Sequence, residues 1–535
     1  MSRFLSLFLL IWVTVSLKPA SAREDLTGVD VVNRAVNALG SKTALAQINT
    51  LAIKAKAKHW EPEQSVIADG EPRFAGDSTF VLTRDFKAGA ARTNWERKLV
   101  YPSPREYKFS EVVAGNIGYV QGIDTSAPVE EALQSNPSQH AMSGLRVATA
   151  LRELERASPM LVRDMQANPS RLARLPDAAV DGRRYKVVAY DWGPYGFNVY
   201  FDADTGLPAR VRTHETDAIQ GDSAFDLVLA DWRAVSGVKF AHALTYELNG
   251  KMVADIRVGE VAVNPAIAPD EFAIPDGIRT TATPAATGKV PYQWVIRRQY
   301  IGVYLDSDKV SFDPEASPGG LRLEEVAPGV SLVRGCTHNS LIVEMPSYLV
   351  VFDAPIGEGQ SQWTIEAARA KYADKPIRYL VLTHHHMDHA SGVRTYVAEG
   401  ADLIVGAGNG QHFKNVLSAP HKIDPDSLQR IKRRGEIIEV SDKLVLSEGK
   451  RELGIYAIEN PHAAGMLFGY VADAKLGFVT DLWSPGQKLG DKPNPMQASL
   501  IAAVARAGVS PERFAGGHGG VGSYADLAGL AAKSQ

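Results

Sequence analysis

The sequence predicts a two-part α/β protein, in which an antiparallel α+β part comes before a layered α/β part. Three observations support this fold class. From about residue 50, short segments alternate apolar and polar residues, as strands with one buried face do. A stretch of small residues with a proline, TTATPAATG at 280–288, then interrupts the pattern. Beyond about residue 322, strand-like and helix-like segments alternate.

The composition is that of an ordinary globular protein. The chain has 535 residues, of which 45% are hydrophobic and 22% charged, enough for roughly two to four domains. Its 58 Lys and Arg residues are balanced by 61 Asp and Glu residues, a net charge of -3. We therefore expect no nucleic-acid partner. The single cysteine excludes an intramolecular disulfide and a cysteine-rich zinc site. The oligomeric state is not encoded in these features.

The first residues have the pattern of a secretory signal. Arg3 supplies a positive charge, residues 4–17 are continuously apolar, and Ala20, Ser21 and Ala22 are small residues suited to cleavage after Ala22. The apolar run is shorter than the ~20 residues that span a bilayer. We expect a periplasmic or secreted protein without a stable transmembrane anchor. An uncleaved anchor is the alternative.

The N-terminal part, residues 23–278, is predicted to be an antiparallel, β-rich domain. Residues 29–40 have helical spacing and end at Gly40. Strands follow at 51–58, 79–85, 184–190, 197–202, 225–232 and 239–247, with a helical insert at 143–157. This order resembles the curved-sheet domains of the outer-membrane lipoprotein carrier family. Such a sheet binds a hydrophobic ligand or packs against the following domain.

Residues 279–321 are predicted to be a linker or bridging segment, and residues 322–535 the second domain. Strands are expected at 330–334, 340–344 and 348–352, and a helix at 361–372 with Ser361 as its N-cap. The apolar segment 377–382 predicts a strand buried on both faces. A helix at 524–532, capped by Ser523, closes the chain.

The segment THHHMDH, residues 383–389, directly follows this buried strand. The carboxyl ends of such strands are where α/β proteins place their sites. Four ligand-type side chains within six residues need a loop, because neither a straight strand nor one helix face lets them converge. Imidazole and carboxylate together suit zinc, with manganese or iron as alternatives.

The pattern H-x-H-x-D-H after an apolar strand resembles the metallo-β-lactamase superfamily. The resemblance covers about residues 322–525 and implies an αββα sandwich. Three further residues occur in the order of the family, each at the end of a predicted strand: His462, Asp481 and His518. Asp353, at the end of an earlier strand, matches a residue that usually orients a ligand.

The resemblance implies a centre with two metal ions, taken to be zinc, with manganese or iron as alternatives. One ion would be held by His384, His386 and His462. The other would be held by Asp388, His389 and His518. Asp481 would bridge the two ions, and a hydroxide between them would complete both shells. Asp388 is also the expected catalytic residue, orienting the hydroxide and accepting a proton.

The remaining histidines are given smaller roles. The His385 side chain should point away from its two neighbours, so we expect a structural role. His338 is expected to be structural rather than a substrate contact. His412 and His421 lie in segments that could overhang the site.

Three functions of different classes remain open. The first is a hydrolase acting on an ester, lactone, thioester, amide or phosphoester of a small, hydrophobic molecule. The second is a carrier of lipid or another hydrophobic ligand, with a subsidiary metal domain. The third is an iron-dependent oxidoreductase on the same fold.

Overall fold

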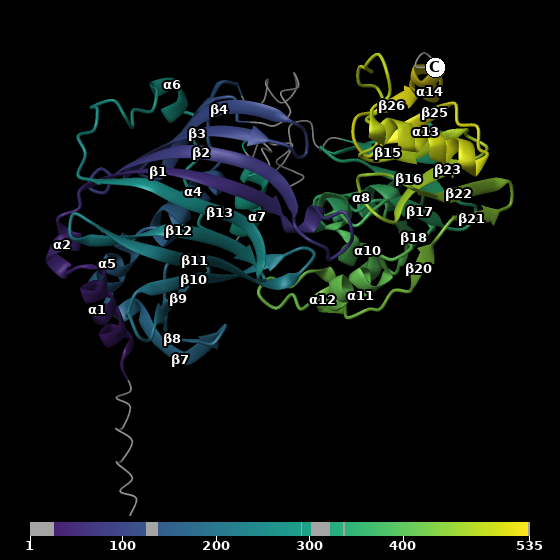
Figure 1. The fold of residues 1–535 in the computed structure, drawn as a ribbon. Coiled ribbons are helices and arrows are strands. Elements are labelled where there is room, and N and C mark those ends of the chain that lie inside the picture. Colours follow the sequence, from purple (N-terminus) through teal and green to yellow (C-terminus); the bar gives the residue numbers. More distant parts are fainter. Residues whose placement is uncertain are drawn as a thin grey trace, which may run out of the picture.

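A computed structural model describes residues 26–124, 137–289, 291–300, 306, 321–334 and 337–532. The predicted signal, residues 1–22, lies outside these ranges. Among the helices of the described residues, none is long and apolar enough to cross a bilayer. Figure 1 shows the chain as two parts side by side, the N-terminal sheet in purple to teal and the C-terminal layers in green to yellow.

The N-terminal part is built on one antiparallel sheet, with strand order β6-β5-β4-β3-β2-β1-β13-β12-β11-β10-β9-β8-β7. Its paired strands follow one another in the chain, except for the pairing of β1 with β13, which joins the first strand to the last. The strands are β1 (Thr50–Glu61), β2 (Arg73–Asp85), β3 (Ala90–Leu99), β4 (Arg105–Ala114), β5 (Ile117–Gly122), β6 (Gln139–Ala141), β7 (Leu172–Val180), β8 (Arg183–Tyr190), β9 (Phe197–Asp202), β10 (Pro208–Asp217), β11 (Gly221–Val235), β12 (Val238–Leu248) and β13 (Lys251–Val263).

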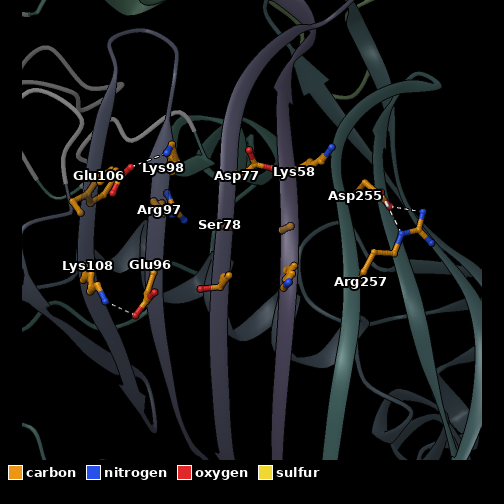
Figure 2. Close-up of a pocket in the computed structure, with 14 residues that line it drawn as sticks. Lys58, Asp77, Ser78, Glu96, Arg97, Lys98, Glu106, Lys108, Asp255 and Arg257 are labelled. Atoms are coloured by element: carbon orange, nitrogen blue, oxygen red, sulfur yellow. Dashed lines mark hydrogen bonds and ion pairs between the residues drawn. The ribbon is translucent and has the colours of Figure 1, made fainter.

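The two faces of this sheet differ as the alternation predicted. On β1 the lysines at 54, 56 and 58 are exposed, while the intervening residues are buried. Across neighbouring strands of the outer face, charges pair with opposite charges: Lys108 lies 2.6 Å from Glu96, and Lys98 lies 2.9 Å from Glu106 (Figure 2). The outer face is therefore a charged surface with a shallow hollow of about 730 Å³.

Helices cover the inner face of the sheet. A hydrophobic core joins residues of α1, α5 and α7 to the inner side chains of the sheet. The helix predicted at 29–40 is α1, and the predicted insert at 143–157 is α4. The helical elements of this part are α1 (Gly28–Leu39), α2 (Lys42–Ala46), η1 (Pro62–Gln64), α4 (Gly144–Arg156), α5 (Met160–Ala167), η2 (Pro169–Arg171), α6 (Asp276–Arg279) and α7 (Tyr292–Tyr300).

Helix α7 falls within the segment predicted to be a linker, and it joins the two parts. Its Ile296 and Tyr300 belong to the core of the N-terminal sheet. Its Trp294 belongs to a core that consists largely of residues from the C-terminal part. The exact limits of the domains stay a prediction.

The C-terminal part contains two further sheets stacked on each other. One sheet has the order β14-β15-β16-β17-β18-β19-β20 and the other β21-β22-β23-β24-β25-β26. The strands are β14 (Arg322–Ala327), β15 (Val330–Arg334), β16 (Ser340–Glu344), β17 (Leu349–Phe352), β18 (Ile377–Val381), β19 (Asp402–Gly406), β20 (Ile437–Val440), β21 (Lys443–Glu448), β22 (Arg451–Ile458), β23 (Met466–Val471), β24 (Leu476–Val479), β25 (Arg513–Gly516) and β26 (Val521–Ser523).

Three hydrophobic cores define the layers of this part. One core lies between the sheets, and the others lie between each sheet and its covering helices. Helices α8, α10 and α11 cover the first sheet, and α13 and α14 cover the second (Figure 1). The predicted αββα sandwich is confirmed. Its helices are α8 (Glu358–Lys371), α9 (Met387–Ala390), α10 (Val393–Glu399), α11 (Gly410–Ser418), α12 (Ser427–Ile431), α13 (Pro495–Ala507) and α14 (Tyr524–Ala532).

The predicted start of one helix is wrong. Ser361 was expected to be an N-cap, but α8 begins at Glu358 with Gly357 as its N-cap, so Ser361 lies inside the helix. Glu358 is fixed in the first turn because its carboxylate accepts a hydrogen bond of 2.8 Å from the backbone N–H of Ser427. This contact comes from a distant segment, so the local pattern did not contain it.

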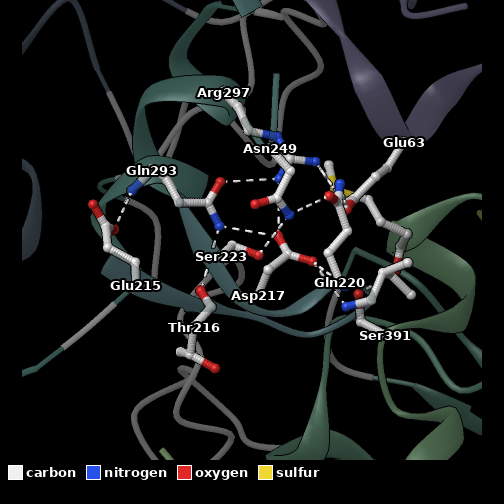
Figure 3. Close-up of polar contacts among 12 residues, drawn as sticks. Glu63, Glu215, Thr216, Asp217, Gln220, Ser223, Asn249, Gln293, Arg297 and Ser391 are labelled. Atoms are coloured by element: carbon white, nitrogen blue, oxygen red, sulfur yellow. Dashed lines mark hydrogen bonds and ion pairs between the residues drawn. The ribbon is translucent and has the colours of Figure 1, made fainter. Parts of the chain in front are cut away.

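A buried ion cluster lies where the two parts meet. Arg297 on α7 is fully buried, and it contacts the carboxylate of Glu61. It also contacts the carboxylates of Glu63 and Asp217 (Figure 3). Its Nη2 also lies 3.0 Å from the sulfur of Met387 in the C-terminal part. Three carboxylates around one guanidinium leave excess negative charge in a site shielded from solvent, and this charge favours protonation of one carboxyl group.

Glu63 is the carboxyl group in this cluster that holds a proton. Burial raises the pKa of Glu63 to about 8, although the Arg297 guanidinium acts in the opposite direction. In the unfolded chain the same proton leaves near pH 4.5. The folded state therefore holds more protons than the unfolded state between these values, and its stability falls as the pH rises through them.

We expect Glu63→Gln to flatten this dependence, because glutamine is neutral at every pH. The free energy of unfolding in urea, compared at pH 5.5 and pH 8, should fall for the unmodified protein and change less for the variant. The hydrogen bond of 2.7 Å that the Gln220 amide donates to this side chain can be kept by the carbonyl oxygen of the introduced amide. Equal slopes in the two proteins would contradict the assignment.

Candidate metal centre

The histidine-rich segment lies at the carboxyl end of β18, a strand inside the first sheet of the C-terminal part. Strand β17 runs parallel to β18, so both strands end at the same edge of the sheet. Asp353, just after β17, accepts hydrogen bonds from the backbone N–H of Thr383 (2.7 Å) and from its hydroxyl (2.9 Å). This buried carboxylate fixes the chain where the segment leaves the sheet, and it lies 3.4 Å from Nδ1 of His389.

A first group of potential ligands gathers at this edge. His384, His386, His462 and Asp481 each offer one ligand atom, and all these atoms lie within 4.8 Å of one another. His462 follows β22 and Asp481 follows β24, so strands of the second sheet supply them. The Oδ2 atom of Asp481 is 2.9 Å from Nε2 of His462 and 3.1 Å from Nε2 of His384. Four convergent donors of this kind can hold one metal ion.

The environment of His386 fits a metal. Its Nε2 lies 3.0 Å from the backbone oxygen of Ser65 in the N-terminal part. A carbonyl oxygen only accepts, so Nε2 carries the ring proton and Nδ1 keeps a lone pair. That Nδ1 is buried and has no hydrogen-bond partner among the described residues. A buried, unpaired imidazole nitrogen beside three other ligand atoms is what a metal ion would satisfy.

A second group contains His338, His389 and His518, whose ligand atoms also lie within 4.8 Å of one another. Asp481 contacts this group as well: its Oδ1 lies 2.7 Å from Nε2 of His518, and its Oδ2 lies 3.3 Å from Nε2 of His389. The Nδ1–H of His518 donates to the backbone oxygen of Thr337 at 3.0 Å, which leaves Nε2 facing Asp481. Asp481 is thus the carboxylate that touches both groups.

Asp388 belongs to neither group. It lies in the short helix α9, and its Oδ1 accepts a hydrogen bond of 2.6 Å from the side-chain amide of Gln64. Its Oδ2 lies 3.1 Å from Nε2 of His338. Of the seven predicted ligands, the structure therefore brings six into the two groups and places Asp388 beside them.

Two imidazoles of the centre have pKa values that suit metal ligands. Burial lowers the pKa of both His384 and His338 to about 3, so both imidazoles are neutral at pH 7. Burial acts to raise the pKa of Asp481, but the neighbouring His389 and His462 hold it well below its ordinary value. His384 and His338 are therefore neutral nitrogen donors, whereas Asp481 and Asp353 hold the pKa of His389 well above its ordinary value despite burial, so without a metal ion its imidazole keeps a proton beside the shared carboxylate.

Other histidines singled out in the sequence lie outside the two groups. His385 donates from Nε2 to the same Ser65 oxygen at 2.9 Å. His412 pairs with Asp69 of the N-terminal part at 2.9 Å, and His421 lies 3.7 Å from Asp426. The roles expected for these three histidines stay predictions.

Sequence reasoning missed several residues that the N-terminal part contributes. The Gln64 side chain and the Ser65 backbone contact the histidine-rich segment. The Tyr101 hydroxyl donates to the side-chain carbonyl oxygen of Gln64. Arg73 donates to the backbone oxygens of Gln64 and His462, both at 2.5 Å. No local pattern marks these residues. His338, which was expected to be structural, stands just before β16 and lies in the second group.

Buried imidazoles in two groups around one shared carboxylate, at the edge of an αββα sandwich, define a metal-binding domain. The family model described as the metallo-beta-lactamase superfamily matches residues 333–518. This part of the chain is therefore a metallo-β-lactamase superfamily domain, and the predicted resemblance is confirmed for it. The resemblance of the N-terminal part to the lipoprotein carrier family stays a prediction.

Relatives share only portions of the chain. A curated linear primary-alkylsulfatase from a Pseudomonas species is 38% identical over 58 residues, which is 11% of each protein. The chain thus matches about a tenth of the length of that relative. Among solved structures, a metallo-beta-lactamase from Pontibacter korlensis is 15% identical with a TM-score of 0.30, over 40% of this chain and 96% of the other. A flavodiiron core from Synechocystis sp. is 16% identical with a TM-score of 0.31, over 39% and 59%.

Proposed function

We propose that the protein is a metal-dependent hydrolase that binds two divalent ions, zinc in the first instance. The observation that carries this proposal is Asp481, whose two oxygens contact the imidazoles of both ligand groups. When bound, two such ions supply hydroxide at neutral pH and stabilise the negative charge that develops on an ester-like substrate.

The chain itself supplies a group that can move a proton beside this centre. The carboxylate of Asp388 lies next to both ligand groups, and the Gln64 amide and the His338 ring orient its two oxygens. Asp388 remains ionised because, despite burial, the hydrogen bond from His338 keeps its pKa well below the ordinary value. An ionised, oriented carboxylate can accept the proton of the attacking water.

Charge near the centre favours an anionic substrate. Arg298 on α7 is 3% exposed, stacks on Trp294 at 4.7 Å, and its Nε has no hydrogen-bond partner among the described residues. It lies close enough to Asp388 for that carboxylate to raise its pKa, although burial lowers it more. An anionic group on a bound substrate would add a favourable interaction with this buried guanidinium. Sulfate and phosphate esters are the classes we place first, and the short match to an alkylsulfatase supports sulfate esters.

A screen of substrate classes on zinc-loaded protein tests the proposal. We expect hydrolysis of at least one class among sulfate esters, phosphoesters, lactones, thioesters and β-lactams, with loss of at least about 10²-fold in His386→Ala. His214, an exposed histidine of β10, gives the control variant His214→Ala, which should keep full activity. Metal analysis of the native protein distinguishes zinc from manganese and iron. Turnover that survives in His386→Ala, or oxidation of substrate by an iron-loaded protein without hydrolysis, would contradict the proposal.

A second candidate function is the binding of a hydrophobic ligand by the N-terminal part. The inner face of its sheet encloses a cavity of about 180 Å³, bounded by apolar side chains of the strands and by α4 and α7. Phe80, Trp95, Leu244, Tyr246 and Ile296 are among its lining residues. Mass spectrometry of an organic extract of the purified protein tests this function. A carrier should retain its hydrophobic ligand through purification, and an extract without such a ligand would contradict the carrier function.

A further inference from the structure

The side chain of Gln64, from the N-terminal part, contacts the metal centre directly. Gln64 lies in η1, the short helical turn that follows β1, and it is 2% exposed. Its side-chain NH₂ donates a hydrogen bond of 2.6 Å to Oδ1 of Asp388. The two residues are 324 positions apart in the sequence, so the packing of the two parts brings them together.

The two oxygens of the Asp388 carboxylate have different partners. Oδ1 accepts from Gln64, whereas Oδ2 lies 3.1 Å from Nε2 of His338, a member of the second ligand group. The family resemblance assigns Asp388 to the second metal ion, and Oδ2 is the oxygen in contact with that group. The Gln64 amide is neutral, so it orients the carboxylate without cancelling the negative charge that attracts a metal ion.

We infer that Gln64 is a positioning residue for the second metal ion: it fixes the Asp388 carboxylate from the N-terminal part, and tight binding of that ion depends on this contact. The inference rests on the metal centre of the proposed function and does not depend on the reaction catalysed there. It makes the centre a site shared by the two parts of the chain, because the amide that holds Oδ1 of Asp388 belongs to the N-terminal part.

The Gln64 amide is itself held in one orientation. A carboxylate only accepts hydrogen bonds, so the NH₂ end of the amide faces Asp388. The other end, its carbonyl oxygen, accepts from the Tyr101 hydroxyl. Arg73 donates to the backbone oxygen of Gln64 at 2.5 Å, and its guanidinium lies 4.8 Å from the centre of the Tyr101 ring. Tyr101 therefore acts on Asp388 through Gln64, because its hydroxyl keeps the amide from turning over.

The backbone that follows Gln64 is anchored to the C-terminal part by its own contacts. The backbone oxygen of Ser65 lies 3.0 Å from Nε2 of His386. The backbone oxygen of Val66 accepts a hydrogen bond of 2.7 Å from the backbone N–H of Ala464. These contacts do not involve the Gln64 side chain, so we expect the connection to stay in place when that side chain is replaced.

Two variants test the role of the amide. Gln64→Met keeps an unbranched side chain of similar length and removes both hydrogen bonds of the amide. Tyr101→Phe keeps the ring and removes only the hydroxyl that orients the amide. The exposed Gln411 of α11 supplies the control Gln411→Met, which makes the same chemical change outside the centre. Circular dichroism and the thermal unfolding midpoint of each metal-free protein show whether the variant is folded.

The experiment measures the affinity of each zinc equivalent. Full-length, metal-free protein is titrated with Zn²⁺ against a chromophoric chelator, and a parallel Co²⁺ titration is followed by its visible absorption. In Gln64→Met we expect one of the two equivalents to bind about 10–100-fold more weakly, with an altered Co²⁺ spectrum, and the other to bind as before. Gln411→Met should match the unmodified protein in both equivalents.

The double variant tests whether Tyr101 acts through Gln64. Tyr101→Phe should weaken the same zinc equivalent by a smaller factor than Gln64→Met does. Combining the two changes should weaken it no further than Gln64→Met alone, because the hydroxyl then has no amide to orient. Additive losses in the double variant would contradict this chain of contacts.

Several outcomes would overturn the inference. Unchanged affinity of both equivalents in Gln64→Met is one, and a lowered unfolding midpoint of the metal-free variant with normal zinc affinity would mean that Gln64 only fills the interface. Equal weakening of both equivalents is another. Unchanged affinity in Tyr101→Phe would also contradict it, and this variant decides the matter where Gln64→Met does not fold.

These affinities are measured without turnover, so the inference and the proposed reaction fail separately. Fewer than two zinc equivalents in the unmodified protein would overturn the metal centre on which both depend. If zinc binds as expected in every variant and the unmodified protein hydrolyses no substrate, the proposed reaction is contradicted and the role of Gln64 stands.

Discussion

Replacing Asp481 with asparagine is expected to cause the largest loss of function, at least about 10²–10³-fold in kcat. The side chain lies within 3.3 Å of four imidazoles, two from each ligand group. Its backbone has a positive φ of 57°, which asparagine tolerates well, so the change removes charge with little strain. Both metal positions lose their shared anion. Zinc analysis and steady-state kinetics on the substrate found in the screen measure the two effects together.

A nearby aspartate supplies the matched control for this variant. Asp473 follows β23, is 45% exposed, and pairs with Arg451 at 3.4 Å. Asp473→Asn makes the same chemical change outside the centre and should keep both metal content and kcat. If Asp481→Asn retained two equivalents of zinc and normal turnover, the shared-carboxylate arrangement would be wrong.

Removing the buried cation at the junction is expected to have the largest effect on stability. Arg297→Met should lower the free energy of unfolding by about 3–5 kcal/mol, the usual cost of breaking a buried ion cluster by deleting one partner. Arg297 is fully buried against Glu61, Glu63 and Asp217, at contacts of 2.5–3.0 Å. Without the guanidinium, these carboxyl groups repel one another in a dry environment. Urea unfolding at constant pH measures the change.

An exposed ion pair on the N-terminal sheet provides the comparison for Arg297→Met. Lys54 lies 2.8 Å from Glu260, and both side chains are about 60% exposed. Lys54→Met deletes a cation of similar reach, yet solvent already screens the pair, so the change should stay within about 0.5 kcal/mol. Equal effects of the two variants would mean that the cluster around Arg297 contributes no more than a surface pair.

Much of the fold could be predicted because it is governed by local patterns. Alternation of apolar and polar residues predicts the strands of the first sheet. The apolar run that forms β18 predicts a strand covered on both faces. The start of α8 was missed because Glu358 is held by Ser427, which is distant in the sequence. Local periodicity contains no information about such a contact.

The residues of the candidate site also fall into two kinds: those that the local pattern locates and those that only the packing of the two parts reveals. His384, His386, His462, Asp481 and the other strand-end residues could be located because strands deliver their ends to one edge. His338 stands before a strand instead of after one, so it was given a structural role. Gln64 could not be found, because its role comes from the packing of the first part against the second and leaves no trace in spacing or composition. The family motif located the centre, and only the packing revealed how Asp388 is engaged.

The oxygen that orients both His385 and His386 belongs to the main chain of Ser65. Every amino acid carries that oxygen, so mutation of the side chain at position 65 can be tolerated by these two rings. Insertion or deletion of a single residue between β1 and this point would instead displace the oxygen by several ångströms. Among homologues of this protein, the number of residues between the end of β1 and residue 65 should therefore be preserved more strictly than the identity of residue 65.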